Sequence, residues 1–215
     1  MKHHINFQAG FTIIELMIST VIFSMILLML TTGVISFTRS YYKGITETNT
    51  QRVARVISDD ITQSIQSTSL DYTVLTTFGG WNGFCIGNTG YAYILGYELV
   101  DSSPDVNLHQ TLHALIKGNV AGGCSSYNGQ TLYNYLSSQS TSEEMLAPSM
   151  RLANLSILTV NQTAGIYSVG INVVYGDDDL LTNPTGLSPS CNINSGSQFC
   201  AVSGLSTVVQ KRIQQ

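Results

Sequence analysis

Glu15 places a carboxylate in the most apolar part of the chain. The residues that follow it, from Leu16 to Phe37, form a run of 22 without a charge. An isolated carboxylate at membrane depth is costly, so by default it marks a functional residue that has a partner. The alternative is that Glu15 reaches the interface or is protonated near the headgroups. The chemistry expected of Glu15 is therefore pairing with an opposite charge.

Three consecutive carboxylates, Asp177, Asp178 and Asp179, directly follow a predicted strand. Carboxylates clustered on a loop suit calcium, which prefers several oxygen ligands. The loop does not have the glycine and glutamate spacing of an EF-hand. The alternative is a solvated turn that ends the strand. Calcium at this loop is a hypothesis, which coincident melting curves with and without calcium would reject, and no other cofactor is expected.

The remaining candidates for catalysis lack the partners that a reaction needs. His109 and His113 would share one face of a helix, but Gln110 stands where the zinc metalloprotease pattern requires glutamate. No third ligand is apparent, so a structural role is favoured. The chain has no Gly-x-Ser-x-Gly motif and no phosphate-binding glycine loop. We therefore expect a protein that is not an enzyme.

The four cysteines predict an oxidising compartment. None of them forms a Cys-x-x-Cys pair, which argues against a zinc ribbon or a thioredoxin-like site. Four cysteines allow three disulfide connectivities. Loop length favours Cys191 with Cys200 and Cys85 with Cys124. Disulfides imply export, and the alternative is four buried free thiols in a cytosolic protein.

The composition excludes two broad classes of protein. Hydrophobic residues make up 43% and charged residues only 10% of the chain, which excludes a disordered chain kept in solution by its charge. A net charge of −4 with nine scattered Lys and Arg residues excludes a generic nucleic-acid binder, because such a protein needs a basic patch. No proline precedes Pro104, so the N-terminal part is free to form a long helix.

The uncharged run from Leu16 to Phe37 predicts a membrane anchor. As a helix of 22 residues it spans about 33 Å, enough for a hydrocarbon core of about 30 Å. The run is too long for a secretory signal and no small-residue cleavage triplet follows it, so we expect it to stay. Lys2 precedes the run, whereas Arg39 and Lys43 follow it. This count would place the C-terminal part in the cytoplasm, while the cysteines argue for the opposite.

A short motif resembles the class III signal of type IV pilins and their relatives: Gly10-Phe11-Thr12-Ile13-Ile14-Glu15-Leu16, after a polar leader. The resemblance implies that a prepilin peptidase cuts between Gly10 and Phe11 and methylates the new amine of Phe11. It also implies that Glu15 neutralises the N-terminal amine of a neighbouring subunit, an attraction that is strong in a low dielectric. The implied orientation has a cytoplasmic leader and an exported C-terminal domain, and we favour it over the charge count.

One helix is expected from Thr12 to about Gln66, and the alternative is a separate amphipathic helix after a loop at Tyr41-Tyr42. Its weakest stretch is Thr31-Thr32-Gly33, because β-branched residues and glycine lower helix propensity. Many pilins have a proline in this part of the helix and this chain has none, so any local melting must occur at that step. Past Tyr42 a buried stripe is expected, which consists of Ile45, Asn49, Val53, Ile57, Ile61 and Ile65, with Val56 alongside.

After Ser69 the composition changes to one typical of strands and turns. Strands are expected over residues 91–100, 155–160, 167–175 and 202–213, with a hairpin turn at 161–165. A long helix followed by antiparallel strands predicts an α+β fold with the helix packed on one sheet face, which is the pilin architecture. The expected division is a leader at 1–10, a transmembrane and filament-core helix at 11–37, an amphipathic continuation at 38–68 and an extracytoplasmic β-rich domain at 69–215.

Within this family, residues 152–179 and 200–209 resemble the W-type minor pilins, whose broader group contains the J-type pseudopilins of type II secretion. The resemblance implies a structural subunit that waits in the inner membrane, primes pilus assembly and enters the filament near its tip. Its implied partners are other minor pilins, the major pilin, the prepilin peptidase and the inner-membrane assembly platform, and nucleic acid is not among them. The alternatives are a J-type pseudopilin or a membrane-anchored extracytoplasmic binding or adhesin domain whose helix is not cleaved.

Overall fold

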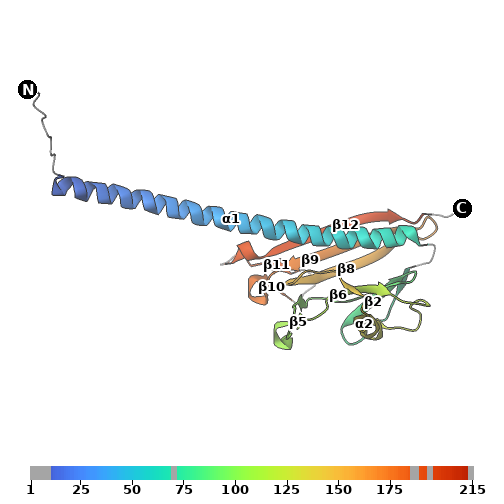
Figure 1. Ribbon diagram of the computed structural model, residues 1–215. Coiled ribbons are helices and arrows are strands. Elements are labelled where there is room, and N and C mark those ends of the chain that lie inside the picture. Colours follow the sequence, from blue (N-terminus) through green and yellow to red (C-terminus); the bar gives the residue numbers. More distant parts are fainter. Residues whose placement is uncertain (1–10, 69–71, 185–188, 193–195, 213–215) are drawn as a thin grey trace, which may run out of the picture. The chain divides into compact units, whose positions relative to one another are not determined.

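The architecture is α+β, with one long helix followed by antiparallel sheets (Figure 1). A computed structural model describes residues 11–68, 72–184, 189–192 and 196–212, so the predicted leader 1–10, with Gly10, lies outside the described residues. The chain divides into two compact units, residues 1–41 and residues 42–215. The predicted fold class is confirmed.

The helix α1 runs over Ile13–Ser67, close to the predicted bounds and without a loop at Tyr41-Tyr42. The Thr31-Thr32-Gly33 step is helical as well. The hydroxyl groups of Thr31 and Thr32 donate to the carbonyl oxygen of Leu28 at 3.0 and 3.1 Å. Such bonds satisfy the polar side chains inside the helix, so they cost little in an apolar environment.

In the second unit, α1 packs on the sheets through a face that differs from the predicted stripe. Ile57, Ile61 and Ile65 are buried as predicted, whereas Ile45, Asn49 and Val56 are exposed and Val53 is half-buried. Other positions, Thr50, Ala54 and Ser58, complete the buried face. The prediction was wrong at its N-terminal end because residues spaced by four advance about 40° per step around a helix of 3.6 residues per turn. Over several steps the stripe therefore leaves the face that is packed.

The sheet under this part of α1 has the strand order β12-β9-β8-β4-β5. Its bounds are β8 Met150–Asn161, β9 Ile166–Tyr175, β12 Ala201–Gln210, β4 Glu98–Leu99 and β5 Gln110–Thr111, with only β4 and β5 parallel. The strands β8 and β9 contain the predicted strands 155–160 and 167–175. The strand predicted over 202–213 was too long, because β12 ends at Gln210 and residues 211–212 are not in a strand, and Ile213 lies outside the described residues. The turn after β8 includes Gly165 at φ +61°, a conformation that glycine adopts without strain.

A second sheet has the order β1-β2-β3-β6-β7, with α2 packed on it. Its strands are β1 Tyr72–Val74, β2 Trp81–Ile86, β3 Thr89–Ile94, β6 Leu115–Asn119 and β7 Glu143–Glu144, and α2 covers Gly129–Ser137. The single strand predicted over residues 91–100 was wrong, because β3 ends at Ile94 and β4 belongs to the other sheet. Gly96 at φ +78° lies in the segment where the chain crosses between the sheets.

Two disulfides join parts of the second unit that the strands alone leave apart. Cys85 of β2 is bonded to Cys124, which lies after β6. Cys191, at the end of β11 Ser190–Cys191, is bonded to Cys200 just before β12. These are the pairings that loop length favours. The remaining short elements are β10 Leu181–Thr182 and the 3₁₀ turns η1 Val106–Leu108, η2 Asp178–Leu180 and η3 Ser197–Phe199.

Candidate functional site

Glu15 lies in the first turn of α1, where it forms a capping box with Thr12. The Thr12 backbone N–H and hydroxyl donate to Glu15 Oε2 at 3.1 and 2.9 Å, and the Glu15 N–H donates to Thr12 Oγ1 at 3.3 Å. This reciprocal arrangement satisfies N–H groups that a helix start otherwise leaves without partners. Glu15 therefore has a local structural role that the sequence analysis did not identify, although the Thr-x-x-Glu spacing shows it.

Phe11, the expected first residue after cleavage, directly precedes this capping box. Its side chain is 81% exposed, and the expected partner residue in the cleaved bond, Gly10, lies outside the described residues. The structure thus places the expected amine of Phe11 only a few residues from the carboxylate of Glu15. The N-terminal end of a helix carries partial positive charge, so this position favours the carboxylate of Glu15.

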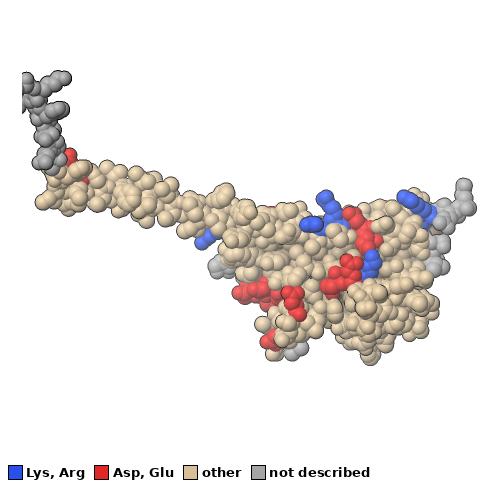
Figure 2. Space-filling model, in the orientation of Figure 1, with Lys and Arg blue, Asp and Glu red and all other residues tan. Residues whose placement is uncertain are grey.

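The surface of the first unit is mostly apolar and has no charge between Glu15 and Arg39. Every described residue from Phe11 to Tyr41 is exposed, and α1 is the one helix of the described chain that is long and apolar enough to cross a membrane. Figure 2 shows this segment as a surface without charge along most of its length. Exposed apolar surface of this extent requires a cover of lipid or of other apolar helices.

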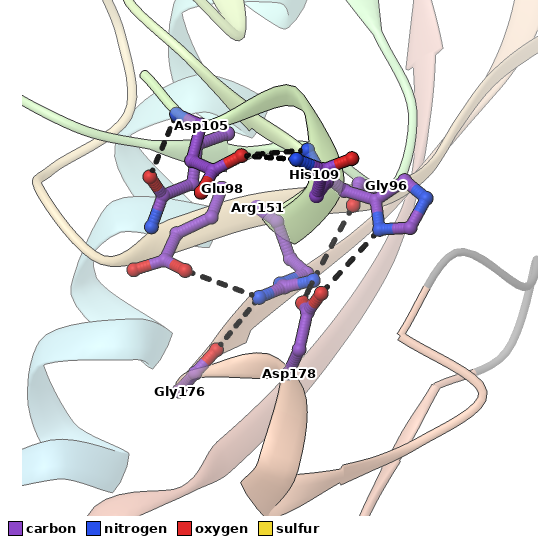
Figure 3. Close-up of polar contacts among 9 residues, drawn as sticks. Gly96, Glu98, Asp105, His109, Arg151, Gly176 and Asp178 are labelled. Atoms are coloured by element: carbon purple, nitrogen blue, oxygen red, sulfur yellow. Dashed lines mark hydrogen bonds and ion pairs between the residues drawn. The ribbon is translucent and has the colours of Figure 1, made fainter. Parts of the chain in front are cut away.

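In the second unit, the most deeply buried charge is Arg151 of β8, which is fully buried. Figure 3 shows carboxylates from two other segments pointing to its guanidinium group. Nη1 donates to Asp178 Oδ1 at 2.5 Å, and Nη2 lies 3.4 Å from Glu98 Oε2. The carbonyl oxygens of Gly96 and Gly176 accept further bonds at 3.4 and 3.0 Å. Arg151 therefore fixes β4 and the loop after β9 to β8, and this role was missed because its partners are distant in sequence.

The charged groups of this cluster interact mainly with one another. Burial raises the pKa of the Glu98 carboxyl above its ordinary value, the nearby Asp177 adds to the rise, and Arg151 opposes it. His109 Nδ1 lies 3.4 Å from Asp178 Oδ2, on the outer side of the same carboxylate. Arg151 Nε has no partner in the described part of the chain. The cluster therefore holds the loop after β9 in place against β8.

The loop expected to bind calcium uses its middle carboxylate for this ion pair. Asp178 contacts Arg151, whereas Asp177 and Asp179 are exposed. Among the described residues, no group of three or more His, Cys, Asp or Glu side chains is arranged to hold a metal ion. Calcium at Asp177 to Asp179 stays a hypothesis.

The two histidines do not share a helix face, so that prediction was wrong. His109 has φ +50° at the turn between η1 and β5, and His113 follows β5. Their side chains face different carboxylates, since His113 Nδ1 lies 3.5 Å from Glu144 Oε2 while His109 faces Asp178. Burial lowers the pKa of His113. Each histidine belongs to a separate polar contact.

Glu144 of β7 is a partly buried carboxylate that accepts backbone hydrogen bonds. The N–H groups of Ala114, Leu115 and Leu146 donate to it at 3.1, 2.9 and 3.2 Å. These bonds favour the ionised form, but burial is the larger influence and raises the pKa of Glu144 from 4.5 to about 7. Its charge state therefore changes within the physiological range of pH.

We expect Glu144 to make the second unit less stable as the pH rises from 4.5 to above 7. Its folded pKa lies above the ordinary value of 4.5, so the stability that its protonation contributes is complete below pH 4.5 and is lost as the pH passes 7. The loss is on the order of 3 kcal/mol. Thermal melting of the full chain in detergent across this range measures it, and Glu144→Gln should remove the share of the slope that belongs to Glu144, while Glu98, whose pKa is also raised, keeps its own share.

The neighbouring exposed Glu143 provides the matched control, since Glu143→Gln should leave the pH profile unchanged. His113 has its pKa lowered, so its contribution changes in the opposite direction, and only the difference between the wild type and Glu144→Gln isolates Glu144. Parallel profiles for the wild type and Glu144→Gln would show that this carboxylate does not titrate in the window.

Comparison with protein-family models matches residues 5–31 to the prokaryotic N-terminal methylation motif. The chain carries the N-terminal signal of a type IV pilin-like precursor. The matched residues include Gly10, Phe11 and Glu15, and they continue into the apolar part of α1. The searches of curated proteins and of solved structures gave no match. The matched signal and the long apolar helix fit a single-pass inner-membrane anchor.

Proposed function

We propose that this pilin-like precursor is a minor type IV pilin, a structural subunit that primes pilus assembly in the inner membrane and enters the filament near its tip. The observation that carries the proposal is the methylation motif at the start of α1, which continues into a fully exposed run without charge from Leu16 to Phe37. Such a segment can be stored in a bilayer and later covered by the helices of other subunits.

Glu15 supplies the proposed contact that sets the position of one subunit against the next. Its carboxylate lies at the N-terminal end of the apolar helix, and a methylated Phe11 amine of a neighbouring subunit is the proposed partner. Both charges are costly in an apolar medium when alone, so assembly is favoured where the two meet. The partners in this proposal are other minor pilins, the major pilin and the assembly platform.

The second unit supports an extracytoplasmic location. It contains two disulfides, and all four cysteines of the chain take part in them. Disulfides persist in oxidising compartments and are rare in the cytosol. This agrees with the orientation implied by the signal rather than with the count of Lys and Arg around the apolar run.

A J-type pseudopilin of type II secretion is the alternative in the same class, since the motif and the anchor serve both. The genes beside this one separate the two, because a pilus retraction motor or a secretin-linked secretion operon would identify the system. The alternative from another class is an anchored extracytoplasmic binding domain. That alternative predicts an uncleaved chain that makes no filament.

Intact mass and N-terminal peptide analysis of the chain from membranes tests the proposal. We expect a chain that begins at Phe11 with one added methyl group, and a mass that rises on reduction by the four hydrogens of two disulfides. A chain that still carries residues 1–10, or that is cut beyond Thr31, would remove the filament role and favour the anchored binding domain.

A further inference from the structure

We infer that the free edge of β12 is a docking site for an extended strand of a different polypeptide, with a carboxylate that faces Arg55. The inference rests on the proposed function, since it names the surface through which such a subunit would meet a partner. It concerns the second unit alone and does not involve the apolar helix surface.

The edge is long, and its own residues include neither the charges nor the prolines that protect many edge strands. β12 covers Ala201–Gln210, ten residues, and contains no charged residue and no proline. Among the described strands, none pairs with its outer edge, whereas β9 pairs with its inner edge over the whole length. The other described sheet-edge strands of the two larger sheets, β1, β5 and β7, have only two or three residues. A long, uncharged edge is a template for pairing with another chain.

The backbone groups that face outward can be identified from the ladder. The N–H of Lys211 donates to the carbonyl oxygen of Gly165, on the β9 side. In an antiparallel pair, alternate residues direct their N–H and C=O groups to the same neighbour. The backbone N–H and C=O groups of the odd-numbered positions of β12 therefore point to β9. Those of Gly204, Ser206 and Val208 point to the free edge.

Side chains at these positions leave room for an added strand. Val208 is 67% exposed, and Gly204 and Ser206 are exposed as well. Val208 stands opposite Ser168 of β9, which in turn stands opposite Leu158 of β8, so these three form one row across the outer face. Leu158 is 64% exposed and lies two strands away from the edge. It provides a reference position on the same face that edge pairing would not involve.

The charge beside the edge indicates what the added strand should carry. A groove of about 300 Å³ lies along β12 and is lined by Gln51, Arg55 and residues 202–205. Arg55 is exposed and has no ion pair within the described part of the chain. A strand added at this edge would place side chains against Arg55, and a carboxylate is the complement of a guanidinium group.

A second copy of this chain fits the edge less well than a different polypeptide does. Antiparallel pairing of two β12 edges would present the same uncharged edge and the same cation from both sides, so neither copy would supply a carboxylate to the Arg55 of the other. The short edges at β1, β5 and β7 offer no other strand of matching length within the described residues. Self-pairing would also bring the two Arg55 side chains to the same interface, where like charges repel.

Site-specific photocross-linking of the full chain in its host membrane tests the inference. A benzophenone amino acid at Val208 should give a discrete adduct with a different chain, and the cross-linked peptide should contain Asp or Glu. Ser206→Pro should reduce the adduct at least tenfold, because it removes an outward N–H and leaves the ladder to β9 complete. Arg55→Glu should reduce it several-fold, and Leu158→Lys should leave it unchanged.

Ser206→Pro is folded if it keeps both disulfides and the wild-type melting temperature. If Ser206→Pro does not fold, Ser206→Lys is used as the edge variant in its place. Four outcomes would each overturn the inference. They are the absence of any adduct, an adduct that Ser206→Pro leaves intact, an adduct formed only between two copies of this chain, and a loss of adduct in Leu158→Lys equal to that in Ser206→Pro. The adduct does not require cleavage at Gly10. If the chain is unprocessed but still gives the edge-dependent adduct, the filament role is rejected and the docking site is kept. Failure of the proposed function can therefore be distinguished from failure of the docking inference.

Discussion

Replacing Glu15 by leucine should leave the chain in the membrane with a folded second unit while lowering its incorporation into filaments about a hundredfold or more. Removal of one partner of a buried ion pair costs about 3–5 kcal/mol, and each 1.4 kcal/mol is about tenfold in an equilibrium. The measurement is the amount of the chain in sheared filaments relative to its amount in membranes, in cells that lack the wild-type copy.

The capping box allows the charge of Glu15 to be separated from its role at the helix start. Glutamine can replace glutamate in a capping box, so Glu15→Gln keeps the helix start and removes only the charge. Thr12→Ala removes the hydroxyl that contacts Glu15 at 2.9 Å and keeps the carboxylate. We expect Glu15→Gln to be as defective as Glu15→Leu, and Thr12→Ala to assemble nearly as the wild type does.

The reverse pattern would contradict the proposed role. If Glu15→Gln assembled normally while Glu15→Leu and Thr12→Ala did not, the carboxylate would act by starting the helix rather than by pairing with an amine. Normal assembly of all three variants would remove Glu15 from the mechanism. Each outcome is read against membrane abundance, which reports folding and insertion independently of assembly.

Local signals in the sequence were sufficient for the first part of the fold. The run from Leu16 to Phe37 predicts a helix from its composition alone, and α1 has nearly the predicted bounds. The strand β9 was equally clear, because the alternation of apolar with small or polar residues from Tyr167 to Val173 needs no information from the rest of the chain. The motif around Glu15 is likewise contiguous, and a family model matches it.

Features that depend on distant contacts were missed or wrong. The packed face of α1 depends on which positions meet the sheet, so Thr50 is buried and Ile45 is not. The break at Gly96 separates two sheets that pattern alone merges into one strand. Arg151 reads as an ordinary residue at a strand start, and its partners Glu98 and Asp178 lie 53 and 27 residues away in the chain. No periodicity reports such a pairing.

The Arg151 cluster should dominate the stability of the second unit. Arg151→Met should lower its free energy of unfolding by about 3–5 kcal/mol, because Glu98 and Asp178 would be left without their cation in a buried place. Thermal melting of the full chain in detergent at pH 7, followed by near-ultraviolet circular dichroism, should show a midpoint lower by about 10 °C. Arg52→Met, an exposed change on α1, should stay within about 0.5 kcal/mol.

A triple variant separates the loss of charge from the loss of packing at this cluster. Replacing a whole buried ion network by neutral groups is often nearly neutral, whereas breaking it on one side is not. Arg151→Met combined with Glu98→Gln and Asp178→Asn should therefore regain most of the lost stability. If the triple variant melts as low as Arg151→Met alone, the contribution of Arg151 lies in its bonds to the carbonyl oxygens of Gly96 and Gly176, which no uncharged neighbour replaces. In that case the guanidinium acts as a backbone clamp between β8 and the two loops, and its charge matters little.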